Sequence, residues 1–136
     1  MADQYRLARN SKSFVDVSLA FEPHPVTGDI TVLKNERAIN NAVKNIIMTS
    51  IGETPFNRDM GSSVSSYMFE LFDEGTAGMI SNEIDRAIRY NEPRVELESV
   101  DVEGQPDQNR FFCRVQYKIV GYEEIFTVDT ILTPTR

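Results

Sequence analysis

The spacing of apolar residues changes at Pro93, and this change constrains the fold more than any other feature of the sequence. Before Pro93, long stretches repeat apolar residues every three or four positions, as on one face of a helix. After Pro93, apolar and polar residues alternate, as in a strand with one buried side. Because proline lacks an amide hydrogen and disfavours helical backbone at the preceding residue, a helix is predicted to end near Asn91.

Three stretches before Pro93 have helical spacing: residues 35–50, 62–73 and 74–91. Asn35 is the predicted N-cap of the first helix, and Thr76 is that of the third. The predicted buried stripes are Ile39, Ala42, Val43, Ile46 and Ile47; Val64, Tyr67, Met68, Leu71 and Phe72; and Ala77, Ile80, Ile84, Ala87 and Ile88.

Strand spacing predicts a β-hairpin over residues 14–34 and three further strands at 95–102, 111–120 and 123–132. Along the first of these three strands, the apolar side changes from Val95 and Leu97 to Val100 and Val102, which predicts a bulge near Ser99. Short turns between the three strands favour an antiparallel meander. The predicted fold is therefore α+β: an N-terminal β-hairpin, three helices and an antiparallel sheet with the helices on one face.

The length of 136 residues suits one domain, predicted over residues 13–136. Residues 1–12 carry Arg6, Arg9 and Lys12 with little apolar content, and they are predicted to form a flexible arm. The net charge of −7 argues against nucleic-acid binding, which needs concentrated positive charge. No apolar run is long enough to predict a membrane span.

The sequence offers little for catalysis or metal binding. A single histidine, His24, and a single cysteine, Cys113, cannot form a zinc cluster, and no phosphate-binding glycine loop is present. Cys113 alternates with apolar residues and is predicted to be a core residue. Acidic residues such as Glu70, Asp73 and Glu74 are expected to solvate a helix end. No catalytic residue, metal or cofactor is therefore expected, and the protein is not predicted to be an enzyme.

Glu92-Pro93-Arg94 is the candidate binding motif. Glu92 and Arg94 are two positions apart in a segment that proline stiffens, so their side chains are expected to start on the same side. One interpretation is a rigid polar fixture that docks on another protein, because arginine can hold a carboxylate through two hydrogen bonds. The other is a solvent-exposed helix stop with a weak ion pair. Physical reasoning alone favours the exposed stop.

The segments "NERAINNAVKNIIMTSIGETPFNRDMGSSVSSYMFELF" and "ISNEIDRAIRYNEPRVELESVDV" resemble the baseplate wedge subunit family of contractile-tailed phages. This family is also called the sheath initiator, and it has a counterpart in type VI secretion baseplates. The resemblance covers about residues 28–132. Its specific parts are Gly52-Glu53 with Pro55-Phe56, Gly61 at the end of that loop, the segment from Phe69 to Phe72 and, above all, Glu92-Pro93-Arg94. Arg58 and Met60 depart from the family, which commonly has proline and an aromatic residue before the glycine.

The resemblance implies a structural protein with a fold like the C-terminal domain of the sheath protein. It implies that Glu92, Pro93 and Arg94 contact the helical core bundle of the wedge proteins, which reverses the preference for an exposed stop. The implied partners are the core-bundle proteins and the tail sheath protein, with tail tube or hub proteins as further candidates. Six copies are expected in the baseplate of a virion that assembles in the host cytoplasm.

Exposed sheet edges suggest how sheath polymerisation starts. Unpaired edge groups can accept extended segments, so arms of sheath subunits are expected to complete the sheet by β-augmentation. The other interpretation is that the hairpin at residues 14–34 covers these edges. Two alternatives remain open. The chain could belong to a type VI secretion system or a tailocin, or it could be a peptidoglycan-cleaving lysozyme, because some family members have been labelled lysozyme-like.

Overall fold

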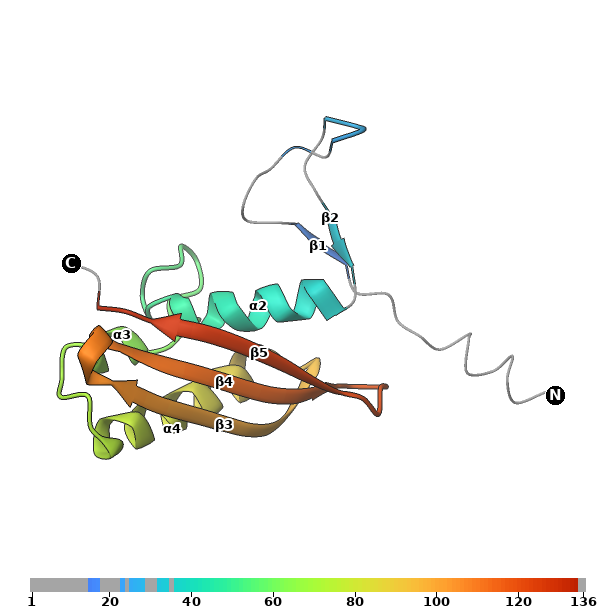
Figure 1. The fold of residues 1–136 in the computed structure, drawn as a ribbon. Coiled ribbons are helices and arrows are strands. Elements are labelled where there is room, and N and C mark those ends of the chain that lie inside the picture. The colour runs from blue at the N-terminus through green and yellow to red at the C-terminus, as the bar shows by residue number, and fades with distance from the viewer. Residues whose placement is uncertain (1–14, 18–22, 24, 29–31, 35, 135–136) are drawn as a thin grey trace. The chain divides into compact units, whose positions relative to one another are not determined.

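The computed structural model describes residues 15–17, 23, 25–28, 32–34 and 36–134. The chain falls into two compact units, residues 1–41 and 42–136, and each is described by itself. In the first unit, β1 (Val15–Val17) and β2 (Val32–Lys34) pair antiparallel, which confirms the predicted hairpin (Figure 1). The arm of residues 1–12, His24 and the predicted cap Asn35 lie outside the described residues. The division into an arm and a single domain stays a prediction.

Helix α2 (Glu36–Met48) matches the first predicted helix and spans the boundary between the units. Its apolar stripe continues into the second unit, where Val43, Ile46 and Ile47 are at most 2% exposed. The helical spacing of this stripe therefore correctly identified core residues.

Helix α4 (Glu74–Asn91) has the predicted bounds, and its stripe is buried as expected. The predicted cap, Thr76, is wrong. The N-cap is Asp73, whose Oδ1 accepts a hydrogen bond from the Thr76 amide at 2.8 Å. Asp73 has extended backbone just before the helix, so its carboxylate reaches the free amide three positions on. Thr76 instead supplies the backbone amide that Asp73 caps.

Helix α3 (Val64–Tyr67) is much shorter than the predicted helix over residues 62–73. Leu71 was expected in the core but is 76% exposed. The chain leaves the helix so that the Phe72 ring packs 4.7 Å from the Phe111 ring. Tertiary packing of this aromatic pair overrides the helical spacing.

The second unit contains an antiparallel sheet in the order β3 (Val95–Gln105), β4 (Arg110–Ile119) and β5 (Ile125–Leu132). A register shift between Leu97 and Ser99 confirms the predicted bulge. The bulge keeps the apolar residues of β3 on one face: Val95 and Leu97 lie opposite Ile119 and Tyr117, and Val100 and Val102 lie opposite Val115 and Cys113. The α+β prediction is confirmed.

The core of the second unit lies between the sheet and its helices. Helix α4 packs on β3, and α3 packs on α4. The inward side chains of β4 are at most 2% exposed: Phe111, Cys113, Val115, Tyr117 and Ile119. This arrangement leaves β3 and β5 as the two edges of the sheet (Figure 1). None of the helices among the described residues is long and apolar enough to cross a membrane.

Candidate functional site

The candidate site is the turn that joins α4 to β3. The helix ends at Asn91, as predicted from Pro93, and the Glu92 amide still donates to Ile88 O at 2.9 Å. The Val95 amide then donates to Glu92 O at 3.2 Å. These two hydrogen bonds close a turn around Pro93, whereas the sequence predicted an extended segment.

Glu92 and Arg94 form a bidentate ion pair within this turn. Arg94 Nε donates to Glu92 Oε1 and Arg94 Nη2 donates to Glu92 Oε2, each at 2.6 Å. The Arg94 amide also lies 3.3 Å from Oε1. The Glu92 side chain is only 5% exposed, whereas that of Arg94 is 30% exposed. The expectation of a solvent-exposed pair is therefore wrong: a buried carboxylate is held by a guanidinium that remains partly at the surface.

Hydrogen bonds to two other segments fix the turn. The Val120 amide, which follows β4, donates to Arg94 O at 2.9 Å. Asn91 Nδ2 donates to Ala87 O at 2.8 Å and reaches Gly61 O at 3.5 Å. The turn is thus preorganised by α4, by the β4–β5 connection and by the loop that ends at Gly61.

Exposed apolar groups accompany this turn. Tyr90 is 68% exposed and precedes Glu92 by two residues, and Val120, which bonds to the Arg94 carbonyl, is 59% exposed. Pro93 is also exposed. Neither Tyr90 nor Val120 was predicted as part of a binding site from the sequence. Tyr90 could have been found because it is a large aromatic residue outside the buried stripe of α4.

The loop from Thr49 to Gly61 presents a second unusual feature. Phe56 is fully exposed and has φ 66°, which is rare for a bulky residue. The loop is held by hydrogen bonds from the Ser50 amide to Glu53 Oε2 at 3.0 Å and from the Gly52 amide to Arg58 O at 2.9 Å. The fold therefore displays an aromatic side chain on an internally bonded loop.

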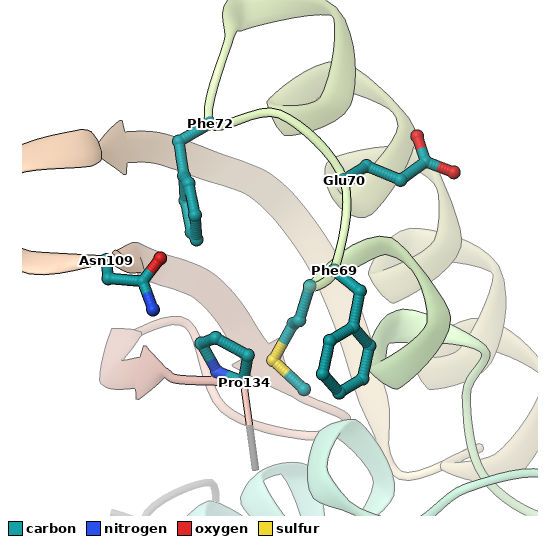
Figure 2. A pocket seen from close by; sticks show the side chains of 6 residues that line it. Phe69, Glu70, Phe72, Asn109 and Pro134 are labelled. Atoms are coloured by element: carbon teal, nitrogen blue, oxygen red, sulfur yellow. The ribbon is translucent and has the colours of Figure 1, made fainter. Parts of the chain in front are cut away.

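A pocket of about 230 Å³ lies beside the β3–β4 turn. Its lining residues are Met68, Phe69, Glu70, Phe72, Asn109 and Pro134. Figure 2 shows the Glu70 carboxylate directed away from the space between Phe72, Asn109 and Pro134. Glycoside hydrolysis needs two carboxyl groups that flank the bond, and this pocket supplies one.

Three of the described carboxylates, Asp73, Glu83 and Asp129, have a lowered pKa. A hydrogen bond from the Thr76 amide lowers the pKa of Asp73. The side chains of Arg86 and Arg114 lower the pKa of Glu83 and Asp129, respectively. A general acid for glycoside hydrolysis needs a raised pKa instead.

Among the residues that the structure describes, neither Cys113 nor the acidic side chains indicate nucleophilic or metal chemistry. Burial raises the pKa of the Cys113 thiol to about 12, so it stays protonated at neutral pH. Within residues 36–134 and the shorter described stretches, no three histidine, cysteine or acidic side chains come together as metal ligands.

Comparisons with known proteins place the chain among tail baseplate proteins. The family described as "Baseplate wedge protein gp25" matches residues 34–123, more than half of the chain. Baseplate wedge protein gp25 of Enterobacteria phage T4 is 29% identical over 84 residues, which cover 62% of this chain and 64% of that relative. The aligned part thus spans less than two thirds of the relative's length.

Solved structures give a consistent fold. A protein from Geobacter sulfurreducens, provisionally named a tail lysozyme, has a TM-score of 0.70 at 25% identity and covers 78% of this chain and 97% of its own. A chain of the type VI secretion system baseplate complex has a TM-score of 0.63 at 12% identity, covers 72% of this chain and 92% of its own, and supports the fold alone. On the family match, the chain belongs to the baseplate wedge protein gp25 family.

Proposed function

We propose that this protein is a structural subunit of the baseplate wedge of a contractile phage tail, where it docks on the helical core bundle of the wedge through Glu92, Pro93 and Arg94. Membership of the baseplate wedge family supports the general role. The observation that carries the docking site is the bidentate pair at the turn, in which Glu92 is buried and Arg94 remains partly exposed.

The geometry suits docking for an energetic reason. Binding costs less when the contacting groups are already ordered, because little side-chain and backbone entropy is then lost. Pro93 restricts the backbone, Glu92 holds the guanidinium plane, and the Val120 amide fixes the Arg94 carbonyl. Exposed Tyr90 and Val120 would add apolar contact area around the polar centre.

A second surface would serve sheath assembly. The edges of the sheet, β3 and β5, pair with no further strand within residues 42–134. Edge strands offer amide and carbonyl groups to extended segments of other proteins. Arms of sheath subunits would therefore extend the sheet, so that a ring of six copies in the virion baseplate initiates sheath polymerisation, with tail tube or hub proteins inside the ring.

The docking role can be tested with Arg94→Lys, which keeps the charge but removes the planar fork. The matched control is Arg86→Lys, because Arg86 also holds a carboxylate, Glu83, through two hydrogen bonds. Each variant is co-expressed with the wedge proteins of its own particle, and co-purified wedge is measured. Arg94→Lys should lose wedge association and Arg86→Lys should keep it. Equal association of both variants would contradict the docking site.

The sheath role can be tested by omission of this protein from tail assembly. Electron microscopy of the resulting particles should show tubes without sheath, and added wild-type protein should restore the sheath. Full-length sheath in the absence of the protein would contradict an initiating role. A capsid gene next to the gene for this protein would distinguish a phage from a type VI secretion system or a tailocin.

The name of the Geobacter neighbour favours a lysozyme as the second candidate function. The lowered pKa values of Asp73, Glu83 and Asp129 give these carboxylates no advantage as proton donors. A muramidase assay with purified protein decides between the two roles. Turnover that disappears when one carboxylate is replaced by its amide would establish the enzyme.

A further inference from the structure

A groove of about 1100 Å³ follows the edge of β3 beside the first half of α4. On the helix side it is lined by Ala77, Gly78 and Ser81, and on the strand side by the stretch from Val100 to Gly104. Gly78 has no atom within 4 Å of the position that a Cβ would take. The small residues of α4 therefore leave space next to an edge strand.

The backbone of β3 faces this groove at alternate residues. Ser81 Oγ donates to Val100 O at 2.9 Å, so this carbonyl points away from β4 and toward α4. In an antiparallel strand, the amide and carbonyl of one residue point to the same side, and the direction repeats every second residue. Val102 therefore also directs its amide and carbonyl away from β4, into the groove.

The open part of this edge is short. At one end Ser81 occupies the Val100 carbonyl, and at the other end a Cβ on Gly104 would lie 2.9 Å from Phe72 O. Gly104 follows Val100 by four positions, so the two ends lie about 13 Å apart along the strand. Val102 lies in the middle and is the natural backbone partner for an added segment.

The side chains of this edge are acidic on the outer face. Asp101 and Glu103 are exposed and form no ion pair with another described residue. Arg114 lies opposite Asp101 in the sheet but uses its guanidinium on Asp129, at 2.8 and 3.1 Å. Asp73 and Glu74 line the helix side of the groove. Four carboxylates thus line a groove whose single guanidinium is already paired.

We infer that the β3 edge around Val102 is the site that accepts a strand from a partner protein, and that this strand carries lysine or arginine at the positions beside Asp101 and Glu103. The intervening side chains are small or apolar, because they face half-buried Val100 and Val102. The inference rests on the proposed β-augmentation and adds which edge is used and what the strand contains. The β5 edge is less suited, since its Asp129 is already neutralised by Arg114.

The test uses the full-length ¹⁵N-labelled protein and two peptides of about five residues, which match the length of the open edge. In one peptide valine alternates with lysine, and in the other valine alternates with glutamate. The lysine peptide should bind and slow hydrogen exchange of the Val102 amide, and the glutamate peptide should not. Thr127 is the comparison for the β5 edge, because the same alternation directs its amide away from β4.

Charge variants distinguish binding of the lysine peptide in this groove from its general attraction to an acidic protein. Asp101→Lys combined with Glu103→Lys should weaken binding of the lysine peptide about tenfold, since two attractive contacts become repulsive. Glu123→Lys combined with Glu124→Lys changes the net charge equally on the exposed β4–β5 connection and should change binding much less.

Three results would overturn the inference: slowed exchange at Thr127 in place of Val102, slowed exchange at neither amide, or equal weakening by both double variants. The first result moves the acceptor to the β5 edge and leaves β-augmentation intact. Either of the other two results would show that the β3 edge is not the acceptor. The proposed role in sheath assembly would still be decided by the sheath-omission experiment.

Discussion

Arg94 holds Glu92 through two hydrogen bonds of 2.6 Å, and the carboxylate that it neutralises is almost fully buried. The pair lies where α4 gives way to β3, so the contact at the proposed docking site also stabilises the fold. Loss of one partner therefore has a cost that loss of both avoids, because a single remaining charge would be buried without compensation.

This relationship predicts the stability of variants. Arg94→Ala should lower the free energy of unfolding by about 2–3 kcal/mol, somewhat less than for a fully buried pair because the guanidinium is partly exposed. Glu92→Met combined with Arg94→Met should recover most of this loss. Urea unfolding of the purified protein measures both variants. A double variant that is less stable than Arg94→Ala would contradict the buried-charge explanation.

The loop that supports the turn depends on Gly61. This residue has φ 117°, and a Cβ there would lie 2.5 Å from Thr49 O. Gly61→Ala should therefore destabilise the protein by at least about 2 kcal/mol, from backbone strain and steric clash. Gly78→Ala is the control: it lies in α4 with open space, so it should stabilise the protein by about 0.5–1 kcal/mol. Thermal unfolding should show opposite shifts.

The hydrogen bonds that Glu83 accepts predict that the stability of the protein depends on pH. Glu83 accepts hydrogen bonds from Arg86 and from the Ser63 amide, and these lower its pKa from 4.5. A lowered folded-state pKa means that this stabilisation is complete above pH 4.5 and is lost as the pH falls through the folded pKa. Glu83→Gln should cost about 1–2 kcal/mol at neutral pH. The difference in the free energy of unfolding between Glu83→Gln and wild type should shrink as the pH falls. A difference that stays constant with pH would contradict this role of Glu83.

The single cysteine reports opening of the core. Cys113 is fully buried, and burial raises the pKa of its thiol to about 12. Because the thiolate is the reactive form, a thiol reagent at pH 8 should modify the native protein only when the sheet opens. The rate of modification should rise in parallel with the unfolded fraction across a urea titration. Rapid modification without denaturant would show that the core is accessible.

Several elements could be predicted because their signals are local. Pro93 fixes the end of α4, strict alternation marks β4, and the break in alternation near Ser99 marks the bulge. The length of α3 could not be predicted, because Phe72 leaves the helical path to pack on Phe111, a residue far away in the sequence.

The candidate site was only partly predictable for a similar reason. The sequence places Glu92 beside Arg94, but a charged residue at a helix end is usually exposed. Burial of Glu92 is a property of the folded turn, to which Val120 and Gly61 come from distant positions and form hydrogen bonds with Arg94 and Asn91, respectively. The groove at Val102 depends likewise on α4 lying beside β3.

A reconstruction of the complete tail end tests the docking claim most directly. We expect Pro93 and the exposed side of the Arg94 guanidinium to contact helices of the wedge core bundle, with Glu92 still bound to Arg94. A well-resolved tail end in which Pro93 and Arg94 face only solvent would contradict it.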